Sequence, residues 1–224
     1  MEHKIIRPGI DPLTPKNMEL SDYNINKYLK KFKVPLDKPL LAQISRFDKW
    51  KDPAGVLEIF KLVKKEVDCR LVLCGSMASD DPEGIQIYER IKQKANSLIA
   101  KGDVILITSE NNILVNALQR SSAVIIQKSI REGFGLTVTE ALWKETPVVA
   151  SNVGGIPLQI SDGENGFLFE PNDNDGFAQK IIELIRKPDL ARKIGENGRE
   201  TVRGKFLVTR ILNDYLDLLN DILN

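Results

Sequence analysis

Short apolar runs recur along the chain and are separated by longer stretches of mixed polarity. Within each run the apolar residues follow one another without alternating with polar ones. Such runs are typical of strands that are buried on both faces of a parallel sheet. The pattern predicts strands over residues 40–44, 70–74, 104–107, 123–126, 147–150 and 166–169.

Between the apolar runs, hydrophobic residues return at helical spacing. After the first run, Val56, Ile59 and Val63 fall on one face of a helix that begins at Pro53, a residue suited to a first helical turn. The same spacing follows most of the other runs. The pattern predicts helices over residues 53–67, near 83–100, over 113–120 and 135–144, and after the last strand to about residue 220.

Strands and helices therefore alternate, and this predicts an α/β fold with a doubly wound, Rossmann-like parallel sheet. Residues 1–20, with three prolines and a glycine, are interpreted as a connector, and residues 21–224 as the domain. Ligands of such sheets bind beyond the carboxyl ends of the strands. The loops expected to carry function are 45–52, 75–82, 107–112, 127–135 and 151–156.

Composition narrows the classes of function. The 224 residues carry a formal net charge of +1, so neither nucleic acid nor an acidic membrane is expected as a partner. No apolar run has the length of a membrane span, and the first residues do not resemble a secretory signal. Cys69 and Cys74 are too few for a disulfide framework, so a cytoplasmic location is expected. With His3 as the sole histidine, a histidine-based catalytic triad is excluded.

The segment from Ser129 to Ala141 carries the strongest chemical signal, because it leaves a strand and opens a helix. Gly133 and Gly135 allow a tight turn and close approach of a ligand. The free N–H groups of the helix tip, over residues 135–137, favour an anion such as a phosphate. Glu140, one turn further, is placed to accept hydrogen bonds from a ribose, and Glu132, before the helix, from the hydroxyls of a sugar.

A second segment, from Ile44 to Asp52, supplies positive charge at the end of the first strand. Arg46 can hold a diphosphate with its planar guanidinium, and Lys51 can act as a point charge. No cluster of Asp, Glu or His near these loops suits a magnesium ion. We therefore expect the two cations to take the place of a metal, with no further cofactor.

Other features have plainer interpretations. Asp80, Asp81 and Glu83 are better suited to capping a helix than to binding a metal. Gly154 and its neighbour form either an anion-binding nest or a simple tight turn. Two further expectations concern packing: Trp50 and Trp143 are expected to be packing residues, and an exposed apolar patch is expected on the last helix around Tyr215 and Leu219.

These motifs resemble a known family. The Glu132/Glu140 segment, continued by Pro147-Val148-Val149-Ala150 and Gly154-Gly155, is similar to the signature of retaining GT-B glycosyltransferases. Over most of the chain, the sequence is most similar to the archaeal trehalose glycosyltransferring synthases. That likeness includes Ser45-Arg46-Phe47-Asp48 and Ile10-Asp11-Pro12-Leu13.

The resemblance implies a nucleoside-diphosphate glucose donor, formation or cleavage of trehalose with retention, and no metal. It assigns Arg46 and Lys51 to the diphosphate, Glu132 to the donor sugar and Glu140 to the ribose, and it places the base near Ile107. The predicted catalytic residues are Glu132, Arg46 and Lys51. The predicted donor-binding residues are Ser45, Ile107, Gly133, Phe134, Gly135, Leu136, Thr137 and Glu140.

The resemblance covers only the second of the two Rossmann-like halves of the family enzyme. We therefore expect an acceptor-binding N-terminal half as a partner, in cis or in trans. The stretch Thr108–Asn112 departs from the family pattern, which leaves the base open. Two alternatives remain: a nucleotide-sugar-binding module without turnover, and a transferase that uses another donor, such as a mannosyl nucleotide.

Overall fold

The computed structural model describes residues 5–76 and 82–223 of the chain. In this described part the strands form one six-stranded sheet with the order β3-β2-β1-β4-β5-β6, in which every pairing is parallel. The predicted doubly wound sheet is confirmed. The strands are Leu40–Ile44 (β1), Arg70–Gly75 (β2), Val104–Thr108 (β3), Val124–Gln127 (β4), Val148–Ser151 (β5) and Phe167–Phe169 (β6).

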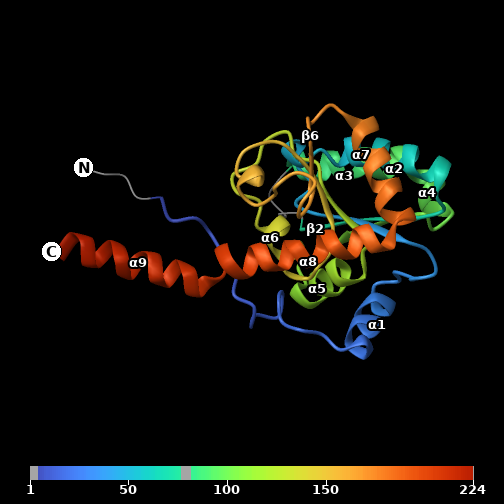
Figure 1. The fold of residues 1–224 in the computed structure, drawn as a ribbon. Coiled ribbons are helices and arrows are strands. Elements are labelled where there is room, and N and C mark those ends of the chain that lie inside the picture. The colour runs from blue at the N-terminus through green and yellow to red at the C-terminus, as the bar shows by residue number, and fades with distance from the viewer. Residues whose placement is uncertain (1–4, 77–81, 224) are drawn as a thin grey trace.

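Helices cover both faces of the sheet (Figure 1). One layer contains α2, α3, α4 and α7, and the other contains α1, α5 and α6. Helix α8 contributes to both apolar clusters, with Ile194 in the first layer and Val202 in the second. The α-helices are Asp22–Lys31 (α1), Pro53–Glu66 (α2), Pro82–Lys94 (α3), Asn96–Ala100 (α4), Asn112–Ser121 (α5), Leu136–Trp143 (α6), Asn174–Arg186 (α7), Pro188–Lys205 (α8) and Val208–Leu223 (α9). Two 3-10 turns, Lys49–Lys51 (η1) and Ile156–Leu158 (η2), lie in loops.

The core consists of two apolar clusters, one on each side of the sheet. Along β1, Leu40 and Ala42 belong to one cluster and Leu41 to the other, because successive side chains of a strand point to opposite faces. All five residues of this strand are buried. The continuous apolar runs of the sequence therefore correspond to strands that are covered on both sides.

The predicted strands match the observed ones within one residue at each end. Two expectations about helices are wrong or incomplete. The helix predicted near residues 83–100 is divided at Ala95 into α3 and α4. Helix α1 was not predicted, because only its Leu29 is buried and most of its residues are polar; Ser21 caps its first turn.

The segment from residue 5 to residue 20 contains no helix or extended strand and lies against the domain. Ile10 is buried and pairs with Leu207, so this segment meets the chain between α8 and α9. Asn17 is also buried. The division into a connector and a domain at residue 20 stays a prediction, although the segment packs on the domain over much of its length.

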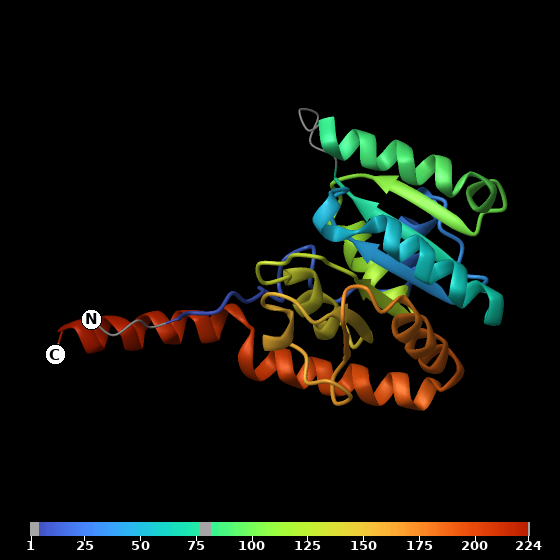
Figure 2. The same cartoon turned by 90° about the horizontal axis from the view of Figure 1, so that it is seen from above.

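Helix α9 projects away from the body of the molecule (Figures 1 and 2). None of its described residues is buried. Its apolar side chains are largely exposed, including Tyr215 at 52% and Leu219 at 54%. The predicted apolar patch on the last helix is thus confirmed, and it extends over Leu212, Tyr215, Leu216, Leu219, Ile222 and Leu223.

Candidate functional site

The order of the strands reverses direction between β1 and β4, and the loops that follow these two strands meet at the carboxyl edge of the sheet. The Thr137 hydroxyl donates to the carbonyl of Ile44 over 3.3 Å. The N–H of Ile130 donates to the carbonyl of Trp50 over 2.8 Å. A topological switch point of this kind is where doubly wound sheets bind ligands. The two segments that the sequence analysis selected therefore lie together.

A cavity of about 300 Å³ opens at this edge, between β1, β2 and β3 and helices α5 and α6. A cavity of this volume can hold one portion of a small ligand. The predicted residues Ser45, Arg46 and Thr137 line it. The other described lining residues are Lys16, Ile44, Cys74, Gly75, Ser76, Ser109, Glu110, Asn111, Asn112 and Val115.

The tip of α6 lies beside this cavity. Gly135 precedes the helix with φ of 84°, a left-handed conformation that suits glycine. The first turn closes with a hydrogen bond from the N–H of Val138 to the carbonyl of Gly135, over 2.9 Å. The N–H groups of Gly135, Leu136 and Thr137 precede that bond, as a site for an anion at a helix tip requires.

The buried side chain of Gln159 holds the glycine loop before α6 in place. Its amide donates to the carbonyl of Phe134 over 2.5 Å and accepts from the hydroxyl of Thr139 over 2.5 Å. Gly154 lies against the same loop with φ of 57°. A Cβ on Gly154 would stand 1.8 Å from the carbonyl oxygen of Glu132, so only glycine fits there. The Gly154 turn therefore supports the loop through close backbone packing.

Glu132 is the centre of a polar cluster. Its Oε2 accepts hydrogen bonds from Lys51 Nζ at 2.5 Å, Gln127 Nε2 at 3.0 Å and Ser129 Oγ at 3.3 Å. Its Oε1 accepts from the N–H of Gly133 at 3.1 Å. The side chain of Glu132 is only 9% exposed. These donors fix the orientation of the carboxylate, and they place the cation of Lys51 directly on it.

The loop after β1 orients its two cations differently. Asp48 accepts from the N–H groups of Trp50 and Lys51, which shapes the turn η1, and the amide of Gln43 donates to the carbonyl of Lys51 over 2.5 Å. Arg46 pairs with Asp48 at 3.3 Å but is 71% exposed, so its guanidinium is free to reorient toward a ligand. Lys51 is thus held by its contact with Glu132, whereas Arg46 is largely exposed.

The expectation that Trp50 is a packing residue is only partly right. Trp50 is 36% exposed, and the guanidinium of Arg131 stacks over its ring at 4.4 Å. This stacking joins the loop after β1 to the loop after β4. Trp143 is partly buried against the core and carries Arg199 over its ring at 4.9 Å.

Glu140 lies one turn into α6 and is buried, with its side chain 5% exposed. Its Oε1 forms an ion pair with Lys16 at 2.8 Å. Within the described part of the chain, its Oε2 has no hydrogen-bond partner. Lys16 belongs to the segment before α1, so a residue outside the predicted site occupies the carboxylate expected to bind ribose.

The side chains of three predicted residues, Ile107, Phe134 and Leu136, are not among those that line the cavity. Ile107 is buried in the core of the sheet, and residues 109–112 line the cavity beyond it. Phe134 stacks on Phe206 with ring centres 5.8 Å apart, while its carbonyl accepts from Gln159. Leu136 is 42% exposed at the helix tip.

Four side chains that organise the site were not among the predicted residues: Gln127, Ser129, Gln159 and Lys16. Gln127 had a visible signal, because it is a polar residue at the end of an apolar strand and is 2% exposed. Ser129 bonds to Glu132 three residues further on, within the same turn. Gln159 and Lys16 act through contacts between segments that are distant in sequence, such as Gln159 with Phe134. No local pattern indicates such contacts.

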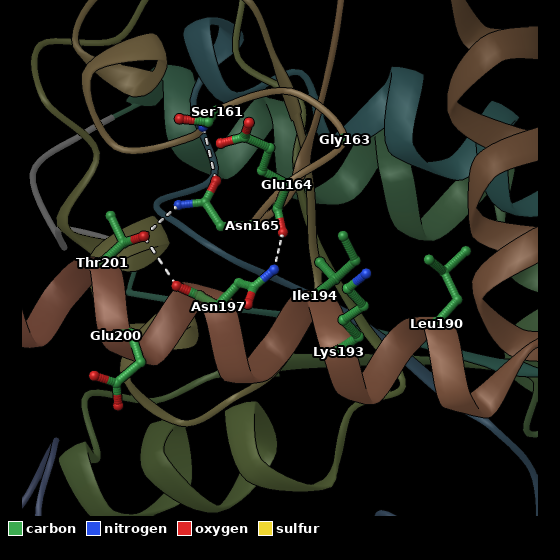
Figure 3. Close-up of a pocket in the computed structure, with 10 residues that line it drawn as sticks. All are labelled: Ser161, Gly163, Glu164, Asn165, Leu190, Lys193, Ile194, Asn197, Glu200 and Thr201. Atoms are coloured by element: carbon green, nitrogen blue, oxygen red, sulfur yellow. Dashed lines mark hydrogen bonds between the residues drawn. The ribbon is translucent and has the colours of Figure 1, made fainter.

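Another pocket, of about 450 Å³, lies between α8 and the loop before β6 (Figure 3). Its polar groups mostly bond to one another: the Asn165 side chain accepts from the N–H of Ser161 and donates to Thr201, and Asn197 donates to the carbonyl of Glu164. Asn165 lies two residues before β6, so this pocket lies at the amino edge of the sheet. The pocket lies between a loop and a helix, at the opposite edge of the sheet from the candidate site.

Among the described residues, no group of three His, Cys, Asp or Glu side chains is arranged to hold a metal ion. Asp80 and Asp81 lie outside the described residues, and the expectation of a metal-free site stays a prediction. No helix in residues 5–76 and 82–223 has the length and apolar character needed to cross a membrane.

Lys144, at the end of α6, is a buried amine next to this site. Its Nζ donates to the Asn17 side chain over 3.1 Å and to the carbonyl of Glu140 over 3.0 Å. Burial lowers the pKa of Lys144 from 10.5 to about 7, and the charge of Glu140 opposes that shift only in part. The other charged groups that act on its pKa are Arg120, Lys16 and Glu19.

We expect Lys144 to make the folded chain more stable as the pH rises above 7. Between pH 7 and 10.5 the unfolded chain holds a proton on Lys144 that the folded chain releases, so the free energy of unfolding increases. From pH 7 to 8.5 the gain is about 1 to 2 kcal/mol. Urea titrations of the native chain and Lys144→Met at both pH values test this.

The variant should lack that gain, and an equal rise in both proteins contradicts the assignment. The window ends at pH 8.5 because burial raises the pKa of Cys69 to about 11 and that of Cys74 to about 12. Above pH 9 these thiols therefore lower the free energy of unfolding as the pH rises, since they ionise more readily in the unfolded chain.

The sheet order, the helix tip at the switch point and the paired acids and cations beside it define the class of protein. The fold is that of the GT-B glycosyltransferases, and the chain is a glycosyltransferase domain. The model of the family described as glycosyl transferases group 1 matches residues 24–201, and the chain belongs to this family.

Among curated proteins, the trehalose synthase of Rubrobacter xylanophilus is 46% identical over 98% of this chain and 52% of its own length. The trehalose synthase of Thermococcus litoralis is 44% identical over 96% of this chain and 52% of its own. The chain thus spans about half the length of these relatives. A solved glycosyltransferase from Rickettsia africae, 28% identical, superposes with a TM-score of 0.83 over 98% of this chain and 57% of that one.

Proposed function

We propose that the chain binds a nucleoside-diphosphate glucose and is the donor-binding half of a retaining glucosyltransferase that forms or cleaves trehalose. The observation that carries the proposal is the convergence of the α6 tip, the cations Arg46 and Lys51 and the acids Glu132 and Glu140 at the β1/β4 switch point. The similarity to trehalose synthases supports glucose as the sugar and trehalose as the product.

In this proposal the diphosphate binds at the N–H groups of the α6 tip, where the helix dipole favours an anion. Arg46, which is mostly exposed, turns onto the diphosphate. Lys51 keeps its contact with Glu132 and shares its charge with a phosphate oxygen. The ribose hydroxyls bind Glu140, and the base occupies the 300 Å³ cavity beside residues 109–112.

Transfer in this proposal replaces one bond at the anomeric carbon with another on the same face. The bond from C1 of the donor glucose to the diphosphate oxygen breaks, and a bond from C1 to the acceptor hydroxyl oxygen forms. The hydroxyl proton passes to the departing phosphate oxygen. Arg46, Lys51 and the helix tip stabilise the negative charge that develops on the diphosphate. Glu132, fixed by its four donors, holds the sugar hydroxyls.

The partner that we propose is an acceptor-binding N-terminal half, in cis or in trans. The length of the relatives supports this proposal, since each is about twice as long as the matched region. The exposed apolar face of α9 supports it as well, because a contiguous apolar surface of this kind is suited to another protein domain.

A direct test of the nucleotide site uses Glu140→Ala. We expect the variant to lose the preference for a nucleoside diphosphate over its 2′,3′-dideoxy analogue, because the buried carboxylate is the proposed acceptor for both hydroxyls. Hydrogen bonds to a charged group contribute about 1.5 to 3 kcal/mol, so the affinity for the ribonucleotide falls about tenfold or more. Calorimetry with UDP, ADP and their dideoxy analogues measures it.

Glu196→Gln, a substitution of an exposed acid on α8, is the matched control and should bind as the native chain does. If Glu140→Ala discriminates between the two ligands as well as the native chain, the ribose assignment is wrong.

Transfer itself is tested with the chain alone and with the N-terminal half of a matching trehalose synthase added. We expect transfer from UDP-glucose or ADP-glucose to glucose only in the mixture. Donor binding without transfer under both conditions indicates a binding module. Tighter binding of a mannosyl nucleotide than of either glucosyl nucleotide indicates a related transferase with another donor.

A further inference from the structure

The segment of residues 11–19, which precedes α1, is anchored on α5 and α6 by polar contacts. The amide of Asn116, a fully buried residue, donates to the carbonyls of Pro15 at 3.0 Å and Met18 at 2.8 Å. Lys144, also buried, donates to the side chain of Asn17 at 3.1 Å. We call this segment, residues 11–19, the strap. Because hydrogen bonds hold the residues on both sides of Lys16, the strap fixes Lys16 in a defined place.

That place is the carboxylate of Glu140. Lys16 Nζ lies 2.8 Å from Glu140 Oε1, and the strap also lies against the cavity, since Lys16 lines it. Glu140 is not among the described residues that line the cavity, although Thr137, one turn earlier on α6, is. Lys16 therefore stands between the cavity and the acid.

The carboxylate beneath Lys16 is only half satisfied. Its Oε2 is buried and has no partner within the described part of the chain, and the whole Glu140 side chain is only 5% exposed. A buried carboxylate oxygen without a donor is costly, so the acid retains the capacity to accept a hydroxyl. Lys16, by contrast, is 34% exposed and can regain hydration by swinging outward.

We propose that the strap is a built-in competitor for the donor: Lys16 occupies, in the free chain, the Oε1 of Glu140. One ribose hydroxyl takes the unpartnered Oε2 and the other takes Oε1, so Lys16 must leave when the nucleotide binds. The inference rests on the proposed function, which assigns the ribose to Glu140. It adds that donor affinity is set by the docking of residues 11–19 and by the exchange of an ion pair for hydroxyl hydrogen bonds.

The consequence is a coupling between the strap and the nucleotide. A ligand without ribose hydroxyls leaves Lys16 on Glu140, whereas a ligand with hydroxyls binds at the expense of that ion pair. Any change that draws Lys16 from Glu140 therefore strengthens binding of the ribonucleotide, because the ligand no longer has to displace it.

The test compares the ratio of the Kd of 2′,3′-dideoxy-UDP to the Kd of UDP in several variants, with the ADP pair measured alongside. In Lys16→Met, whose side chain retains the bulk of lysine without its charge, we expect this ratio to rise about tenfold above that of the native chain. A ratio is used because loss of a positive charge weakens both diphosphates alike. Lys16→Arg, which retains the cation, should leave the ratio unchanged.

Lys30→Met removes an exposed charge from α1 and should also leave the ratio unchanged. A ratio in Lys16→Met that equals or falls below the native value overturns the competitor role. The double variant Lys16→Met/Glu140→Ala separates this failure from that of the proposed function. If the ratio stays high in the double variant, the hydroxyls do not bind Glu140, and the ribose assignment fails instead.

Discussion

Replacing Arg46 and Lys51 together with Met should weaken binding of a nucleoside diphosphate about 100-fold while changing binding of the nucleoside less than about twofold. The reason is that both cations adjoin the proposed diphosphate position at the α6 tip, whereas the proposed position of the nucleoside is the cavity beside residues 109–112. Charge-assisted hydrogen bonds contribute about 1.5 to 3 kcal/mol each, and two of them account for such a loss. Calorimetry with ADP, UDP, adenosine and uridine measures both quantities.

The matched control removes two cations elsewhere. Lys61→Met with Arg192→Met removes the same charge from α2 and α8, and Arg192 is 69% exposed, close to the 71% of Arg46. We expect this control to bind both ligands as the native chain does. Equal binding of nucleoside and nucleoside diphosphate by the native chain contradicts the diphosphate role.

Loss of Lys51 also leaves Glu132, a largely buried carboxylate, without its cation, so the fold needs a separate check. Arg46→Met alone answers this concern, because Arg46 is exposed and its ion pair with Asp48 contributes little to stability. We expect the single variant to retain the native unfolding midpoint and to lose about tenfold in diphosphate affinity.

Gly154→Ala should destabilise the domain by about 3 kcal/mol, which corresponds to a fall of about 6 to 12 °C in Tm for a chain of this size. Two effects add. The residue has φ of 57°, which costs an alanine about 1 to 2 kcal/mol, and its Cβ would stand 1.8 Å from the carbonyl oxygen of Glu132. Because the loop must move to relieve that contact, the affinity for a nucleoside diphosphate should fall as well.

Gly163→Ala separates the two effects. Gly163 has a similarly positive φ of 76°, but a Cβ there meets no described atom within 4 Å. We expect a loss of about 1 kcal/mol from the backbone conformation alone, with unchanged nucleotide affinity. Equal losses in the two variants, measured by thermal unfolding, contradict a specific role for Gly154 in supporting the Glu132 loop.

The parts of this site differ in how far the nearby sequence predicts them. The glycines of the α6 tip and the cations after β1 were predicted because loops at the ends of buried strands meet at one edge of a parallel sheet. The structure brings these parts together through Thr137 and Ile44. The contacts of Glu132 with Gln127 and Ser129 follow from the same turn, and the polar end of the strand was their signal.

The sequence alone determined the order and character of the strands, because a strand buried on both faces needs a continuous apolar run. It also determined which loops carry charge and which glycines permit a turn. It did not determine α1, whose one buried residue, Leu29, belongs to the same apolar cluster as residues of α5.

Only the tertiary structure decided the pairing of charges: Lys51 with Glu132, 81 positions apart, and Lys16 with Glu140, 124 positions apart. The physical reason is that periodicity reports burial, which each residue expresses locally. An ion pair depends instead on where two side chains end in space, and that is set by the packing of the whole sheet and its helices.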